Sequence, residues 1–376
     1  MQTAGIYIHI PFCITKCIYC DFYSVAGQDD RIDNFVNALI AEIKNSDIDV
    51  SKWKFDTIFI GGGTPSVLSP NQLEKVISTL DKRIGLNNKI EFTLEANPGE
   101  APLGKLRDFR TLGINRLSIG IQSFNLKLLK FLSRIHTSND AVNTFNSARK
   151  AGFDNINCDL IYNVPDQTVN DWKNDLNKLV ELGPEHISAY SLTVENGTVL
   201  NDLVNNKTVK IPDDEMQIDF YNTATEILSR NNYQQYEISN FSKAGKECLH
   251  NLHYWNHDKY IGFGPSAHSF DGLKRWNNYS NLEQYILFIE NDKSPIESYD
   301  HISENDRINE IVGFGLRMID GVELNKIPNN RIIGLRDRVQ KIRNKYPDMI
   351  IMDNSNLRLN QRGLQFADAI AVELMI

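Results

Sequence analysis

The chain has 376 residues, of which 41% are hydrophobic and 23% are charged. This length and apolar content predict two soluble domains with ample core. The formal net charge of −8 argues against a nucleic-acid partner, and no apolar stretch is long enough for a transmembrane helix. The N-terminal residues lack the basic segment of a signal peptide, so we expect a cytoplasmic protein with reduced cysteines. Peripheral membrane contact and the oligomeric state are left open.

The first predicted element is a short strand with alternating apolar residues at positions 6–10, ended by Pro11. The loop that follows carries Cys13, Cys17 and Cys20 in a CxxxCxxC spacing. A 4Fe-4S cluster takes one thiolate per iron, so three cysteines leave one iron with an open position. This loop therefore predicts a metal site that can also bind a substrate.

Strands and helices alternate over the next part of the chain. With the first strand, the apolar patterns predict strands at residues 6–10, 56–60, 90–94, 116–121, 156–161 and 186–192. Helices are expected between them at residues 31–45, 69–80, 103–112, 141–151 and 169–182, and glycine stops the last three of these helices. Six such units in series predict an α/β fold in which a parallel sheet curls into a partial (β/α)6 barrel.

Polar residues recur where the predicted strands end. Residues 61–65, GGGTP, follow the second strand and allow a ligand to approach the backbone closely. Glu95 and Gln122 follow the third and fourth strands, and Asp159 lies in the fifth. Because the active site of an α/β barrel lies at this end, we expect these residues to meet the cysteine loop. The alternative for that loop, a zinc site completed by His9 or a distant ligand, does not explain this recurrence.

The CxxxCxxC spacing with Tyr19 before the third cysteine resembles the signature of the radical S-adenosylmethionine (SAM) enzymes. The longer stretch, residues 8–24, is similar to the coproporphyrinogen-oxidase-like branch and, within it, to the HemW-type haem chaperones. The resemblance covers essentially the whole chain. It implies a 4Fe-4S cluster held by Cys13, Cys17 and Cys20, with SAM at the open iron.

The resemblance also implies which residues contact SAM. Tyr7 and Tyr19 would flank the cluster and SAM, and Gly62, Gly63 and Thr64 would hold the methionine part. The remaining polar groups of SAM would be bound by Glu95, Gln122, Arg134 and Asp159. These types suit the task, because carboxylates accept hydrogen bonds from hydroxyl and ammonium groups and a guanidinium pairs with a carboxylate. The branch usually has glycine just before Arg134 and four residues after Asp159, where this chain has serine and asparagine.

A second informative stretch is residues 250–255, HNLHYW, which resembles the HNxxYW motif linked to haem binding in the HemW-type chaperones. Histidine is a common axial ligand of haem iron, and aromatic rings supply flat apolar faces. We therefore expect His250 to contact haem; the alternative is an ordinary packed loop. Weaker candidates for haem contact are His253, His257 and His268. His268 lies at a glycine-rich strand end, which could face the same end of the barrel as the cysteine loop.

The last part of the chain changes character. Two helices, two short strands and a closing helix predict a small α+β, winged-helix-like module that acts as a lid or docking domain; the expected spans are residues 308–318, 331–346, 349–352, 357–359 and 363 onwards. We therefore divide the chain into a barrel, a connecting segment with the HNxxYW motif, and a C-terminal domain, at residues 1–240, 241–300 and 301–376.

These features predict a haem chaperone that binds a 4Fe-4S cluster and SAM, takes up haem and transfers it to acceptor apoproteins. The alternative is an oxygen-independent coproporphyrinogen III dehydrogenase, which decarboxylates two propionates. Such enzymes have a further cysteine where this chain has Phe22, and a longer N-terminal arm. A radical enzyme that modifies RNA or peptides would explain the barrel but not residues 250–255. Whether SAM is cleaved or only bound is left open.

Overall fold

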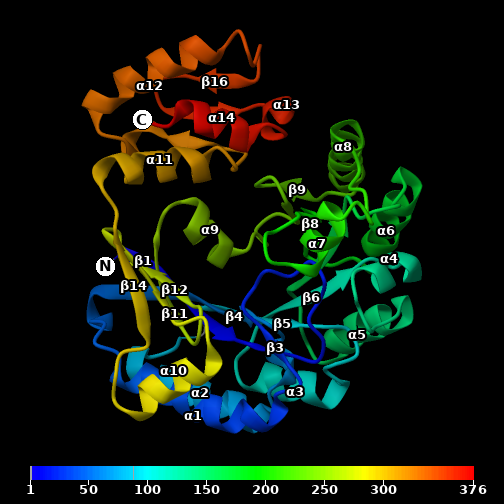
Figure 1. Cartoon of the computed structure of the whole chain (residues 1–376), viewed down its shortest axis with the longest axis vertical. Helices are drawn as coiled ribbons and strands as arrows, with labels where there is room; N and C mark the ends of the chain where they lie inside the picture. The colour runs from blue at the N-terminus through cyan, green and yellow to red at the C-terminus, as the bar shows by residue number, and fades with distance from the viewer. Residues whose placement is uncertain (1, 88) are drawn as a thin grey trace.

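The structure, a computed structural model, describes residues 2–87 and 89–376 (Figure 1). Six parallel strands lie side by side in chain order and form the centre of a 12-stranded sheet. They are β1 (Gln2–Ile10), β4 (Trp53–Gly62), β5 (Glu91–Ala96), β6 (Arg116–Gln122), β7 (Ile156–Tyr162) and β8 (His186–Ser191). This order confirms the predicted partial barrel, with each strand one to four residues longer or shorter at its ends than its apolar pattern suggests.

Helices follow each of these strands, and most of them run along the outer side of the sheet in Figure 1. Helix α7 (Val199–Asn205) instead lies against the cysteine loop through a hydrogen bond from the Leu200 amide to the carbonyl of Ile18. Side-chain caps begin several of them; Thr137, for example, forms a capping box with Asp140, so the fifth helix starts before its apolar pattern does. The helices are α1 (Ile32–Asn45), α2 (Pro70–Ile84), α3 (Leu103–Thr111), α4 (Leu126–Phe131), α5 (Ser138–Lys150), α6 (Val169–Leu182), α7 (Val199–Asn205) and α8 (Asp214–Arg230). Four single 3-10 turns lie at Asp29–Arg31, Val50–Lys52, Pro65–Val67 and Leu324–Lys326.

The segment at residues 241–300, which the sequence predicts as a connection, is built into the barrel sheet. Its strand β11 (Lys259–Phe263) pairs in parallel with β1 and so satisfies backbone groups that would otherwise form an open edge. The sheet then continues in antiparallel fashion through β12 (His268–Phe270), β13 (Lys274–Asn278) and β14 (Ile296–His301). The other edge carries β10 (Asn240–Ser242) and β9 (Gln234–Gln235), while β2 (Phe12–Cys13) and β3 (Val25–Ala26) form a separate pair. Helices α9 (Leu249–Trp255) and α10 (Leu282–Glu290) complete the segment.

The C-terminal residues form a small α+β domain above the barrel in Figure 1. It contains helices α11 (Glu304–Gly315), α12 (Asn329–Ile342), α13 (Gln361–Leu364) and α14 (Ala367–Leu374), with the antiparallel strands β15 (Val322–Glu323), β17 (Asn356–Leu359) and β16 (Ile350–Met352). Leu316, Leu357 and Ile370 are fully buried in a hydrophobic cluster separate from that of the barrel. Tyr221 of α8 also belongs to this cluster, which therefore includes the contact between the domain and the barrel, and the boundary near residue 301 stays a prediction. Among the helices of residues 2–87 and 89–376, none has the length and apolarity needed to cross a membrane.

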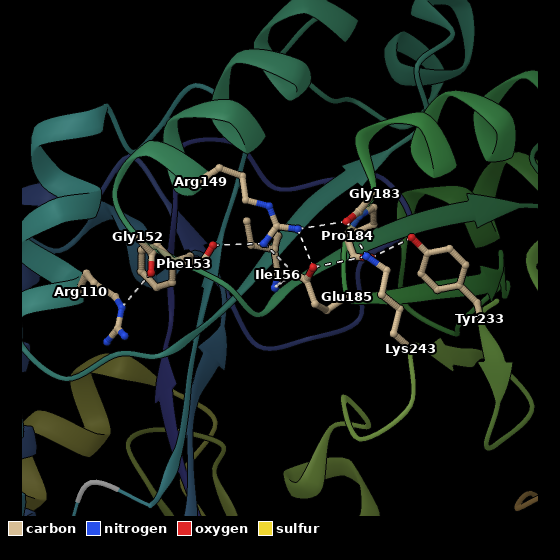
Figure 2. A network of polar contacts seen from close by, with 10 residues as sticks. All are labelled: Arg110, Arg149, Gly152, Phe153, Ile156, Gly183, Pro184, Glu185, Tyr233 and Lys243. Carbon is tan, nitrogen blue, oxygen red and sulfur yellow. Dashed lines mark hydrogen bonds and ion pairs between the residues drawn. The ribbon is translucent and has the colours of Figure 1, made fainter. Parts of the chain in front are cut away.

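A polar network joins the amino-terminal ends of β7 and β8, opposite the cysteine loop (Figure 2). The Glu185 carboxylate lies 2.7 Å from Arg149 Nη1 and accepts a 3.1 Å hydrogen bond from the Ile156 amide. Lys243 lies 3.5 Å from the same carboxylate and donates a 2.9 Å hydrogen bond to the carbonyl of Gly183. The Glu185 side chain therefore joins the start of β7 to Arg149 of α5 and to Lys243, and Lys243 in turn reaches the end of helix α6.

We expect Glu185→Ala to lower the free energy of unfolding by about 2 kcal/mol, because it removes the only carboxylate paired with the partly buried Arg149 in the described residues and leaves that cation only carbonyl acceptors. Glu181→Ala, at an exposed position of α6, is the matched control. Urea denaturation measures both variants. Equal unfolding midpoints for the two would show that the network does not stabilise the barrel.

Candidate functional site

A cavity of about 830 Å³ opens at the carboxyl ends of the barrel strands. All the predicted site residues except His250 line it, because the carboxyl ends of parallel strands meet at one edge of the sheet. The predicted residues in its wall are Tyr7, Cys13, Cys17, Tyr19, Cys20, Gly62, Gly63, Thr64, Glu95, Gln122, Arg134 and Asp159. Residues that are far apart in the sequence therefore line one cavity, as expected from their places at the strand ends.

Cys13 ends β2, Cys17 and Cys20 lie on the loop between β2 and β3, and all three line this cavity. Thr64 Oγ1 and Arg134 Nη1 lie 3.5 Å from the sulfur atoms of Cys13 and Cys17, respectively. Burial raises the pKa of the Cys13 thiol and raises that of Cys20 to about 11, which favours the protonated form of these two thiols. Within residues 2–87 and 89–376, no three Cys, His, Asp or Glu side chains gather around one point as a single metal ion requires. The arrangement is compatible with a cluster, in which each thiolate binds a different iron.

Asn97 joins the two residues that contact the cysteines. Its side-chain amide donates hydrogen bonds to Thr64 Oγ1 at 2.9 Å and to Glu100 at 3.1 Å. The Arg134 guanidinium donates to the side-chain oxygen of Asn97 and, at 3.0 Å, to the carbonyl of Gly120. Sequence reasoning did not assign Asn97 a role, although it lies two residues after Glu95 in the turn that ends β5. It holds the walls on both sides of the cysteine loop in one network.

The glycine-rich turn after β4 packs closely against β1 and the start of the cysteine loop. Gly62 has a φ of +108°, and a Cβ there would lie 2.6 Å from the His9 ring. A Cβ on Gly63 would lie 2.6 Å from the carbonyl oxygen of Phe12. The sequence predicts that these glycines leave the space that a ligand needs. The structure adds a second reason: without side chains, the turn can pack directly against β1 and Phe12. The Gly62 amide donates a 3.2 Å hydrogen bond to Glu95.

Two partly buried carboxyl groups, those of Glu95 and Asp159, line the part of the cavity that we call its floor. Burial and, second, the nearby charge of Asp159 raise the pKa of Glu95 to about 8, so Glu95 is largely protonated at neutral pH. Burial also raises the pKa of Asp159, which accepts hydrogen bonds from Ser118 at 3.2 Å and Asn157 at 2.8 Å. Arg116, only 1% exposed at the start of β6, lines the same cavity and offsets this negative charge, and the sequence reasoning missed it. The floor can bind hydroxyl and cationic groups of a polar ligand.

Gln122 ends β6 in a left-handed conformation, with a φ of +65°. This backbone turn breaks the regular register between β6 and β7 and brings its side chain to the cavity wall. Ser133 and Asn163, which stand where the related branch usually has glycine, also have positive φ angles of 58° and 66°. Both replacements therefore lie at turns and keep the backbone shape that glycine favours.

The predicted haem residue, His250, lies on α9 behind the cavity wall and is only 1% exposed. Its Nδ1 is 2.8 Å from Thr57 Oγ1, and its Nε2 is 2.9 Å from the hydroxyl of Tyr254. Burial lowers the pKa of His250 to about 3, so the ring is neutral. Haem iron could reach this ring only if one of the two hydrogen bonds were broken, and haem contact at His250 stays a prediction.

Helix α9 itself is held by a carboxylate from the barrel. Glu91, the first residue of β5, accepts hydrogen bonds from the amides of Leu249 at 3.0 Å and His250 at 3.1 Å. These two amides belong to the first turn of the helix, where backbone donors lack helical partners. The cap aligns the helix so that Asn251 and Tyr254 reach the cavity wall.

Comparison with known proteins places this site in a family. The radical SAM superfamily profile matches residues 7–179. The chain is 37% identical over 317 residues to "Heme chaperone HemW" of Bacillus subtilis strain 168, with 84% of each chain covered. The chain belongs to the HemW family of radical SAM proteins. The Escherichia coli K12 relative of the same name is 39% identical over 265 residues, which cover 70% of this chain and 69% of that one.

The solved structure of E. coli coproporphyrinogen III oxidase, HemN, matches this HemW-family chain with a TM-score of 0.85. The match covers 100% of this chain and 90% of HemN at 21% sequence identity, and it confirms the fold. Membership of the radical SAM superfamily implies a 4Fe-4S cluster and SAM. The cavity fits both, because it combines three thiols with buried carboxyl and guanidinium groups.

We expect Gly62→Ala to lower the free energy of unfolding by about 1 to 3 kcal/mol and to weaken SAM binding, because its Cβ would displace His9 and strain the backbone. Gly104→Ala is the control: it lies in α3, and no other described residue comes within 4 Å of its added Cβ. Urea denaturation and equilibrium dialysis with SAM measure the two effects. If the Gly62 and Gly104 variants behaved alike, close packing of the turn would not be required.

Proposed function

We propose that this HemW-family chain is a haem chaperone that binds haem and transfers it to acceptor apoproteins. The observation that carries the proposal is its similarity, over 84% of its length, to a relative named "Heme chaperone HemW". The HNxxYW motif supports it, because the motif forms a helix whose residues Asn251 and Tyr254 lie in the cavity wall.

We further propose that Cys13, Cys17 and Cys20 hold the 4Fe-4S cluster and that SAM binds between this loop and the cavity floor. The cluster held there would supply the electron for any cleavage of SAM. Arg134 is positioned by Asn97 to pair with a carboxylate, and the protonated Glu95 can donate a hydrogen bond. Gly62, Gly63 and Thr64 present backbone and hydroxyl groups to the methionine part. Tyr7, Tyr19, Gln122 and Asp159 are proposed as the remaining contacts of this site.

We expect anaerobic reconstitution to load one cluster per chain and Cys17→Ser to lose most of the iron, because one iron would lack its thiolate. Cys13→Ser and Cys20→Ser should behave alike. Cys158→Ala is the control, since this thiol is buried within β7 and does not line the cavity. Iron analysis and absorption spectra measure the loss, and a full iron complement in Cys17→Ser would refute the assignment.

The second candidate is an oxygen-independent coproporphyrinogen III dehydrogenase, which the fold similarity to HemN favours. Against it, Phe22 stands where the dehydrogenases have a further cysteine, and its side chain is 64% exposed beside the cavity mouth. Decarboxylation requires two specific propionates to be placed in turn, and a misplacement of about 1 Å can cost roughly a hundredfold in rate. The chaperone proposal places no such demand on the cavity.

We expect the reconstituted protein to form no protoporphyrinogen from coproporphyrinogen under anaerobic, reducing conditions with SAM. The same preparation should bind haem, measured by the Soret absorption band. Stoichiometric product, formed together with deoxyadenosine and methionine, would establish the dehydrogenase instead.

A further inference from the structure

The haem axial ligand can be sought among all the histidines of the chain. An imidazole binds iron through a ring nitrogen that carries no proton and makes no other bond. The chain has eight histidines. The ligand must therefore reach the cavity and keep one ring nitrogen available.

Four of these histidines use both ring nitrogens inside the fold. His250 bonds to Thr57 and Tyr254, as described above. His9 lines the cavity, but its Nδ1 is 3.0 Å from the Tyr7 hydroxyl and its Nε2 donates to the carbonyl of Tyr23 at 2.8 Å. The other two are His186, bonded to Asn157 and Tyr236, and His253, bonded to Asp56 and Asp258.

Three further histidines lie outside the main cavity. His136 is 4% exposed and bonds to the carbonyl of Ile121 at 3.0 Å. His257 bonds through Nε2 to Glu310 at 2.7 Å and lines only a smaller neighbouring cavity. His301 ends β14 and lines neither cavity.

His268 meets both requirements. It is the first residue of β12, its side chain is exposed, and it lines the main cavity. Its ring forms no hydrogen bond with any other residue in the part of the chain that the structure describes. Burial and the nearby charge of Arg275 lower its pKa, which favours the neutral ring that binds iron.

The surroundings of His268 suit a flat apolar ligand. Tyr254 and Tyr260 line the main cavity with it, and the same three residues line the neighbouring cavity of about 280 Å³. The rings of Tyr254 and Tyr260 lie edge to face, with their centroids 4.7 Å apart. Arg275 adds a cation to the smaller cavity and is held there by a bidentate pair with Glu310, at 2.7 and 2.9 Å. The charge of Arg275 is thus balanced by Glu310, and it is the aromatic rings that match the flat apolar face of a porphyrin.

We propose that His268 supplies the axial imidazole to haem, and that His250 is a positioning residue that orients Tyr254 through its Nε2. This inference rests on the proposed haem-chaperone function and names the ligand within it. This assignment explains why His250, the histidine of the motif, is buried behind the cavity wall. Removing the His250 ring would release the Tyr254 side chain from the wall but would leave the iron ligand in place.

Titration with ferric and ferrous haem, followed by absorption and electron paramagnetic resonance, tests the assignment. In His268→Ala we expect the imidazole signature to disappear and haem affinity to fall by at least about tenfold. Added free imidazole should restore the signature in this variant, and His268→Cys should change it to that of a thiolate ligand. His250→Ala should keep the imidazole signature while binding haem more weakly. His301→Ala is the control and should match the unaltered protein.

An unchanged imidazole signature in His268→Ala would overturn the ligand assignment while the unaltered protein still bound haem. Loss of that signature in His250→Ala alone would do so as well and would identify His250 as the ligand. Absence of haem binding by the unaltered protein would instead refute the chaperone function, and the ligand assignment with it. Circular dichroism of each variant separates ligand loss from misfolding.

Discussion

Strand β1 lies between β4 and β11, paired in parallel with both, and this pairing places the cysteine loop, the glycine-rich turn and the segment with His268. The cysteine loop follows β1, the glycine-rich turn ends β4, and β12 with His268 follows β11. Because the three strands run in the same direction, the segments that follow them emerge at one edge. Register brings His9 opposite Gly61 and Ile10 opposite Gly62, so the turn needs residues without side chains.

A buried carboxylate fastens the strand turn beside His268 to the barrel. Glu42, on α1, accepts hydrogen bonds from the Gly264 amide at 2.8 Å, from Asn278 at 2.6 Å and from Tyr285 at 2.6 Å. Burial raises its pKa to about 7, and these three donors oppose that rise. Helix α1, which follows the cysteine loop, therefore holds the turn between β11 and β12 in place. These hydrogen bonds connect the two sides of the cavity.

Glu310 and Phe314, both on α11, bring the C-terminal domain to the smaller cavity. Glu310, on α11, pairs with Arg275 from β13 and His257 from the turn after α9. Despite its burial, these two partners lower the pKa of Glu310 to about 2, so the carboxylate is ionised at neutral pH. Phe314, one helical turn later, completes the wall of the smaller cavity. The domain therefore forms part of the wall next to His268.

By itself, the sequence determined the barrel strands, the cysteine loop and twelve of the residues that line the main cavity, but not Asn97 or Arg116. These predictions use local signals: apolar periodicity, glycine at helix ends and a family motif. Each signal spans a short stretch of the chain and can be recognised in the sequence alone. The tertiary structure alone decided that residues 259–301 extend the sheet, that Asn97 and Glu91 hold the site together, and that His250 lies behind the wall. These outcomes depend on contacts between residues that are distant in sequence, such as His250 with Thr57 and Glu42 with Gly264. No local pattern shows which ring nitrogens such contacts occupy.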